Sequence, residues 1–205
     1  MQVVADMQEH MDFLNLEYLQ LGSAKQKQAA MVIDELRLWD HLKPCNPILV
    51  GTIPIGIDIA SSDLDIICHV TDFARFEREL TTHYSQLVSN FTCSSRTVNN
   101  VDRTVARFQY KGWVFEIFAQ PIPSTKQNGY RHMIVEYKLL KRLGETARQG
   151  IIELKRSGYK TEPAFAKLLH ITGDPYEELL NMYHWPEDRL DAYIKSYMDK
   201  ENEYE

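Results

Sequence analysis

The chain has 205 residues, of which 44% are hydrophobic and 25% are charged, as is usual for a globular protein. This length suits one domain, or a core domain with a helical extension. Lys and Arg total 23 and Asp and Glu total 29, so the net charge is −6. This acidity argues against tight nonspecific binding to nucleic acid, which requires a basic surface. We therefore expect no nucleic-acid partner.

The sequence shows no pattern typical of a membrane span, a signal peptide or a disulfide framework. No apolar run approaches the roughly 20 residues of a membrane span. The first 14 residues do not place a basic region before an apolar one, as a signal peptide would. Cys45, Cys68 and Cys93 are an odd number without a CxxC pair, so we expect free thiols in a reducing compartment. These features together predict a cytoplasmic protein that does not enter a membrane.

The first 40 residues predict two helices. Apolar residues crowd the segment 13–21, which ends at Gly22. Ser23 followed three residues later by Gln26 is typical of a capping box at the start of a second helix. That helix is expected to stop before Pro44, because the residue before a proline disfavours helical geometry.

The middle of the chain changes to a strand-like pattern. We expect strands over 47–52, 63–70, 91–96, 103–110 and 113–120. A helix is expected over 73–88, between the second and third of these strands. Lys111 and Gly112 read as a two-residue hairpin turn between the last two strands. With that turn, Arg107 lies directly opposite Glu116.

The final third predicts several helices, separated by residues that typically start or end helices. Their expected segments are 127–143, 145–157, and three helices that start near Thr161, Asp174 and Trp185. Gly144 closes the first of them, and Thr161 and Asp174 are expected N-caps. The predicted class is α+β, with a small mixed sheet flanked by helices. We expect a core over residues 1–125 with the N-terminal helix pair, and a helical region over 126–205 packed on it.

Two acids in one strand carry the first chemical signal. Asp63 and Asp65 flank Leu64, and alternation along a strand places both carboxylates on the same face, roughly 7 Å apart. Neighbouring anions are costly unless a cation lies between them, and hard oxygen ligands suit Mg²⁺ or Mn²⁺. A solvated strand end with two exposed acids is the alternative, and the spacing alone does not separate the two interpretations.

Glu116 is a third acid, placed in the otherwise apolar strand WVFEIFA. We expect it to be buried, and a buried carboxylate needs a partner. A cross-strand ion pair with Arg107 would satisfy this need with no catalytic role. Glu116 would otherwise complete a metal site with Asp63 and Asp65, and Arg107 would orient it or contact phosphate.

These motifs resemble those of a known group of proteins. The segments GTIPIGIDIASSDLDIIC, EIFAQ, QNGYRHMIVE and GYKTEPAFAKLL are similar to an uncharacterised bacterial family, a domain of unknown function assigned to the nucleotidyltransferase superfold. The resemblance implies a small mixed sheet with helices and two divalent metal ions. It also implies transfer of a nucleoside monophosphate from a nucleoside triphosphate (NTP) to an acceptor such as a hydroxyl.

The resemblance also implies roles for individual residues. Asp63 and Asp65 match the metal-binding pair, and Glu116 matches the third carboxylate, which often serves as the base. Gly51 and Thr52 match the turn that holds the triphosphate, although Thr52 departs from the usual Gly or Ser. Ser62, in the loop before the Asp pair, either donates to phosphate or caps the strand entry; capping is the preferred interpretation.

A second polar group opens the helix that follows the Glu116 strand. Arg131 and His132 lie near its N-terminus, where backbone N–H groups attract anions, and are candidates to bind triphosphate or an acceptor carboxylate. The alternative is that Asn128 caps the helix and Arg131 pairs with an acid such as Glu136. His132 has no metal-ligand partner at a recognisable spacing, so no zinc site is predicted.

The sequence therefore predicts a nucleotidyltransferase that depends on Mg²⁺ or Mn²⁺. Its substrates would be an NTP and an unknown small-molecule or protein acceptor. The competing prediction is a protein with the same fold that binds nucleotide, metal or a partner protein without catalysis, because one fold hosts many functions. A third possibility is a small transferase that modifies a companion protein in a two-protein regulatory pair.

Overall fold

The computed structural model describes the backbone of residues 11–204 and the side chains of residues 11–200. Its internal contacts divide the chain into two compact units. Unit 1 holds the chain up to Gly56 together with Ser62–Gln127, and unit 2 holds Ile57–Ser61 together with the chain from Asn128 onward. Within the described residues, no helix combines the length and the apolar character that a bilayer crossing demands.

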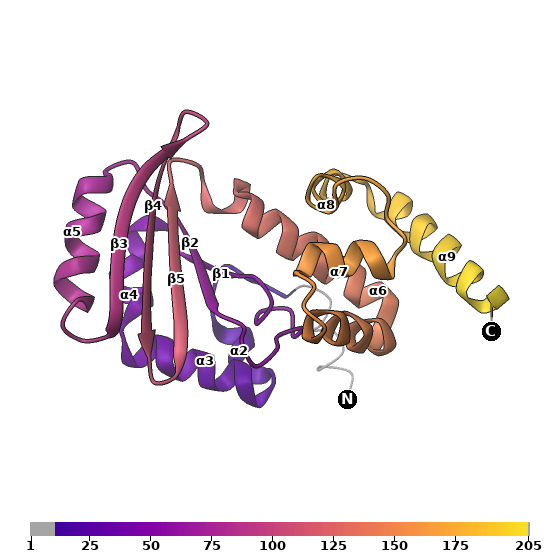
Figure 1. Ribbon diagram of the computed structural model, residues 1–205, viewed down its shortest axis with the longest axis horizontal. Coiled ribbons are helices and arrows are strands. Elements are labelled where there is room, and N and C mark those ends of the chain that lie inside the picture. Colours follow the sequence, from indigo (N-terminus) through magenta and orange to yellow (C-terminus); the bar gives the residue numbers. More distant parts are fainter. Residues whose placement is uncertain (1–10, 205) are drawn as a thin grey trace. The chain divides into compact units, whose positions relative to one another are not determined.

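Unit 1 is built on a five-stranded mixed sheet (Figure 1). The strands are β1 (Ile48–Val50), β2 (Leu64–His69), β3 (Ser89–Val98), β4 (Val101–Tyr110) and β5 (Trp113–Gln120), in the spatial order β1-β2-β5-β4-β3. The β2–β5 pair is parallel, and all other neighbouring pairs are antiparallel. The expected α+β class, with a mixed sheet and flanking helices, is confirmed.

Helices cover one face of this sheet. They are α2 (Glu17–Leu21), α3 (Ala24–Glu35), α4 (Leu38–Leu42) and α5 (Phe73–Tyr84), with short 3-10 turns η1 (Lys43–Cys45) and η2 (Ser124–Lys126). The α5 side chain Tyr84 stacks on Phe108 of β4, which stacks on Phe115 of β5 with ring centroids 4.8 Å apart. All three rings are fully buried, so this aromatic column anchors the helical layer to the sheet.

Two local predictions in unit 1 are confirmed. Ser23 accepts a hydrogen bond from the Gln26 backbone N–H, and the Gln26 side chain accepts one from the Ser23 N–H, so the capping box is complete. Lys111 and Gly112 both have positive φ, 48° and 82°, as a tight two-residue hairpin turn requires. The turn fixes the β4–β5 register and places Arg107 opposite Glu116, as expected.

Unit 2 is helical. Its helices are α6 (Asn128–Arg156), α7 (Thr161–Leu168), α8 (Pro175–Tyr183) and α9 (Glu187–Tyr204). The break predicted at Gly144 interrupts α6, where φ is 79° and ψ is −165°. Asp174 caps α8 as expected, but Thr161 is not a cap: it is the first helical residue of α7, and Lys160 occupies the N-cap position without a side-chain bond.

Candidate functional site

The Asp63-Leu64-Asp65 segment enters β2 and runs beside β5. Asp65 is the register partner of Glu116 in the parallel pair, and of Val50 on the other side. Directly paired residues project to the same face of a sheet, so the carboxylates of Asp65 and Glu116 are neighbours. Two chain segments about 50 residues apart thus bring their acids together on one face.

Arg107 of β4 links two of the three acids. Its Nε lies 2.6 Å from Oε2 of Glu116, and its terminal nitrogen lies 3.7 Å from Oδ2 of Asp63. One guanidinium can approach both carboxylates only if they share a face of the sheet. The cross-strand Arg107–Glu116 ion pair is therefore present, and the arginine also provides positive charge to Asp63.

Glu116 is less buried than its sequence context predicts. Its side chain is 30% exposed, as is that of Asp63, and Arg107 is 56% exposed. Alternation explains the difference: Phe115 and Ile117 project into the helix-covered face, whereas Glu116 projects to the opposite face. The expectation of a buried Glu116 is wrong, because the face that carries Glu116 also carries Val114 and Phe118, which makes the whole strand read as apolar.

Gly51 lies against the Asp65 carboxylate. Its φ is +80°, a conformation that L side chains rarely adopt, and a Cβ added there would lie 2.7 Å from Oδ2 of Asp65. Both the backbone conformation and the close approach require glycine. The turn after β1 is thus held directly beside the acidic pair, which is where the resemblance places a phosphate-binding turn.

The hydroxyl of Thr52 donates a hydrogen bond to Oγ of Ser62, at 3.2 Å. Thr52 follows the Gly51 turn, and Ser62 directly precedes Asp63, so the bond joins the turn to the entry of β2. This contact fits the capping interpretation of Ser62. The phosphate-binding roles of Thr52 and Ser62 stay predictions.

Arg131 and His132 belong to unit 2. The Arg131 guanidinium lies over the ring of Tyr183, 5.8 Å from its centroid, and its buried Nε finds no hydrogen-bond partner in the part of the chain that the structure describes. The suggested Arg131–Glu136 pair is not among the ion pairs of the described residues. A role of Arg131 and His132 in phosphate or acceptor binding stays a prediction.

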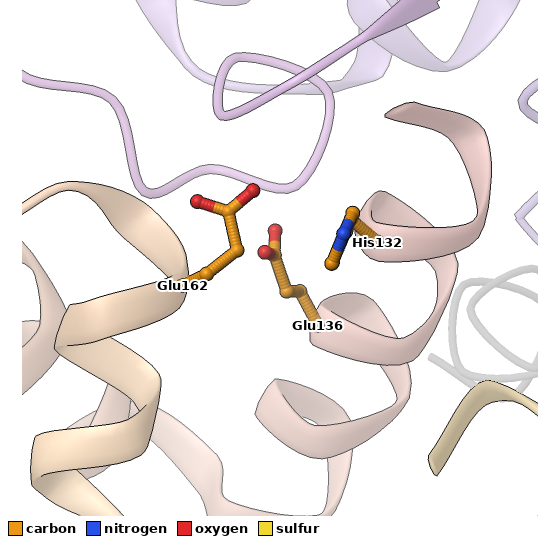
Figure 2. Close-up of side chains that lie close together, drawn as sticks. All are labelled: His132, Glu136 and Glu162. Carbon is orange, nitrogen blue, oxygen red and sulfur yellow. The ribbon is translucent and has the colours of Figure 1, made fainter. Parts of the chain in front are cut away.

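His132 does have potential metal-ligand partners, contrary to the sequence analysis (Figure 2). Glu136 lies one helical turn further along α6, and Glu162 lies in the first turn of α7. One ligand atom from each residue lies within 4.8 Å of the other two. The His132–Glu136 spacing of four residues was a usable signal, but Glu162 joins only through tertiary packing.

Burial dominates the electrostatics of this group. It raises the pKa of Glu136 well above its ordinary range; the negative charge of Glu162 adds to the rise, and Lys155 opposes it. Burial also lowers the pKa of His132, against the opposing effect of Glu162. Both shifts favour the uncharged forms, and a neutral imidazole keeps a lone pair available for a metal ion.

Among the described side chains, His132, Glu136 and Glu162 form the one group of three or more His, Cys, Asp or Glu residues gathered this closely. The carboxylate oxygens of Asp63, Asp65 and Glu116 are more widely spread, with Arg107 beside them. The assignment of these three acids as metal ligands and catalytic groups therefore stays a prediction.

Comparison with known proteins gives a family match and a set of distant structural likenesses. A search of curated proteins found no match. Among solved structures, the chain is similar to the Cid1 poly(U) polymerase with Mg 3'-dATP bound, at 15% identity and a TM-score of 0.48, over 77% of this chain and 48% of that one. It is also similar to a cytoplasmic RNA terminal U-transferase, at 16% identity and a TM-score of 0.47, over 77% of this chain and 46% of that one. The chain thus spans about half the length of these structures.

The family match is made by sequence. A family model described as "Domain of unknown function (DUF4269)" matches residues 31–182, which is well over half of the chain. This range includes β1 to β5 with the Gly51 turn and the three acids, and it continues through α6 and α7 into α8. The chain therefore belongs to the family described as Domain of unknown function (DUF4269).

Proposed function

We propose that the protein is a Mg²⁺-dependent nucleotidyltransferase, which moves a nucleoside monophosphate from an NTP to a small-molecule or protein acceptor. The observation that carries the proposal is the shared face of Asp63, Asp65 and Glu116, with the Gly51 turn packed against Asp65. Transfer of this kind depends on positioning and charge neutralisation more than on covalent chemistry by the protein. Partly exposed carboxylates beside a glycine turn suit both needs.

The donor set fits a hard divalent cation. Asp63, Asp65 and Glu116 offer carboxylate oxygens, the ligands that Mg²⁺ and Mn²⁺ prefer. When bound, such ions would neutralise phosphate charge and stabilise the attacking and leaving oxygens. The Gly51 turn lets the backbone approach a phosphate closely, and Arg107 would exchange a carboxylate for a phosphate oxygen, which guanidinium groups bind well.

A second function is favoured by one specific observation. Arg107 already supplies positive charge to Glu116 at 2.6 Å and to Asp63 at 3.7 Å. An arginine that neutralises these acids permanently would replace the cation and leave a protein that has the fold without transferase activity. Such a protein would bind nucleotide or a partner protein as a sensor or regulator.

Thermal unfolding with added ligands tests the proposal. The full chain would be melted with Mg²⁺ or Mn²⁺ alone, and with each of ATP, GTP, CTP and UTP. A ligand present at about 100 times its dissociation constant stabilises the folded state by about 2.7 kcal/mol. We expect stabilisation by metal and nucleotide together, lost in Asp63→Asn and in Asp65→Asn. Asp102→Asn serves as control, because Asp102 is an exposed acid of the same sheet, bonded to Thr97.

Stabilisation that survives both substitutions would contradict the site assignment. Activity is a separate measurement: release of pyrophosphate from the preferred NTP, with small molecules, proteins and an RNA oligonucleotide as acceptors. Pyrophosphate release lost in Glu116→Gln supports catalysis. Binding without release on any acceptor favours the second function, and transfer to RNA would overturn the expectation from net charge.

Arg107→Gln separates the two functions further. If Arg107 competes with a metal ion for the carboxylates, its removal strengthens binding of Mn²⁺ alone and weakens binding of the metal–nucleotide pair. If Arg107 is a permanent structural counter-charge, its removal lowers stability and creates no dependence on nucleotide.

A further inference from the structure

A second candidate site is built from residues of unit 2 and shares none of the three acids Asp63, Asp65 and Glu116. His132 and Glu136 stand one turn apart on α6, and Glu162 faces them from the first turn of α7 (Figure 2). One potential ligand atom of each residue lies within 4.8 Å of the other two. An ion at about 2.0–2.2 Å from each ligand needs ligand atoms no more than about 4.4 Å apart, so small side-chain movements would bring all three into contact with one ion.

The group is buried and its hydrogen bonding is incomplete. His132 is 8% exposed and Glu136 is 3% exposed. Nδ1 of His132 is buried and has no hydrogen-bond partner among the described residues. A buried polar atom without a partner is costly, and such atoms are rare in folded proteins. The imidazole of His132 thus has a nitrogen free to bind a ligand, and one of its two ring nitrogens lies close to both carboxylates.

A positive charge already lies near the carboxylates of this group. Glu136 and Glu162 contribute two carboxylates, and Lys155 is a positive charge that acts on Glu136. The Lys155 ammonium, itself buried, donates a hydrogen bond to the carbonyl oxygen of Ile57 at 2.7 Å. A divalent ion bound beside both carboxylates would offset the negative charge that ionised Glu136 brings into this buried site.

We propose that His132, Glu136 and Glu162 bind one divalent first-row transition-metal ion, with Zn²⁺ as the best-suited probe. A mixed imidazole and carboxylate set suits Zn²⁺, whereas Mg²⁺ prefers an all-oxygen set with several waters. Three protein ligands leave a coordination position open. The Tyr176 ring of α8 stands edge-on to His132, with centroids 6.1 Å apart.

The ion would join α6 to α7. Its ligands are distant in sequence: Glu162 lies 26 residues after Glu136 and 30 residues after His132. An ion that binds the folded unit and not the unfolded chain raises stability. The site therefore has a readout that is independent of any enzymatic activity.

The test uses the full chain, freed of metal with a chelator and dialysed. Zn²⁺ is then titrated by calorimetry, and Co²⁺ is added separately because its visible absorption reports coordination number and ligand type. We expect one Zn²⁺ per chain, a Co²⁺ spectrum of nitrogen and oxygen ligation, and no competition from millimolar Mg²⁺. Loss of an outer-shell partner costs about 10- to 100-fold in metal affinity, so loss of a ligand should cost at least tenfold.

Three variants make the outcome specific. Glu136→Gln keeps the size of a buried side chain, whereas Glu162→Gln changes a half-buried one. If Glu136→Gln fails to fold, the Zn²⁺ affinity of Glu162→Gln still tests the site. Glu153→Gln removes an exposed acid from the same α6 and should leave affinity unchanged. The proposal is overturned if folded Glu162→Gln binds Zn²⁺ as tightly as the parent, or if binding is lost in Asp63→Asn instead.

Discussion

Substitution of Gly51 by Ala gives the sharpest test of the geometry around the acidic pair. Two costs follow from the structure. An L residue at φ +80° is strained, which costs about 1–2 kcal/mol. The added Cβ also meets Oδ2 of Asp65 at 2.7 Å, closer than real Cβ contacts allow. That carboxylate must turn away, so the second cost falls on the site and not only on stability.

Gly112→Ala is the matched control. Gly112 has φ +82°, so the strain is nearly the same, but nothing lies within 4 Å of an added Cβ. Both variants should lose about 1–2 kcal/mol of unfolding free energy from backbone strain. This corresponds to a melting temperature lower by several degrees for a chain of this size. Only Gly51→Ala should also disturb Asp65.

The assay pairs urea unfolding with the metal–nucleotide melts. We expect Gly112→Ala to keep the full ligand-induced stabilisation and Gly51→Ala to lose most of it. In an Asp65→Ala background, the extra cost of Gly51→Ala should vanish, because the clashing atom is gone and only the φ strain remains. Equal stabilities and equal ligand responses for the two glycine variants would refute the argued contact between Gly51 and Asp65.

Three further predictions concern stability. Burial and His83 lower the pKa of His41, whose Nδ1 lies 2.6 Å from the Tyr84 hydroxyl. As the pH falls, the His41 imidazole is therefore protonated at a lower pH in the folded state than in the unfolded state. The free energy of unfolding thus falls as the pH drops below about 6.5. In His41→Gln, urea unfolding should show a shallower fall; identical pH profiles would contradict this. Asp174→Ala removes the side chain that accepts hydrogen bonds from two backbone N–H groups at the start of α8. We expect a loss of about 1 kcal/mol of unfolding free energy, measured by urea unfolding. An unchanged free energy of unfolding would mean that water replaces the cap. Phe165→Ala empties a fully buried position in unit 2 and should cost about 3–5 kcal/mol, measured by the same method; a loss below 1 kcal/mol would mean that the site collapses around the gap.

Local signals account for what the sequence predicted well. The Ser23–Gln26 capping box, the Lys111-Gly112 turn and the break at Gly144 each depend on residues within a few positions. A two-residue turn also fixes register along the whole hairpin, which is why Arg107 could be placed opposite Glu116 from sequence alone.

Non-local pairing accounts for what residue patterns alone did not predict. The parallel β2–β5 pair sets Asp65 beside Glu116, but its strands are about 50 residues apart and no turn joins them. Parallel register has no short connection to fix it, and depends on how the intervening helix and hairpin pack. The convergence of the acids came from the family resemblance, and the spacing of the residues could not supply it.

The buried carboxylate belongs to Glu136 and not, as the apolar strand suggests, to Glu116. Glu116 sits in an apolar strand but is 30% exposed, because alternate strand positions face opposite sides. Glu136 sits on the buried stripe of α6, between Met133 and Leu140 at helical spacing, and is 3% exposed. In a helix, positions three and four apart share a face, so an acid inside such a stripe cannot reach solvent without rotating the helix. The periodic position of Glu136, with a histidine one turn before it, was the stronger sequence signal for a site.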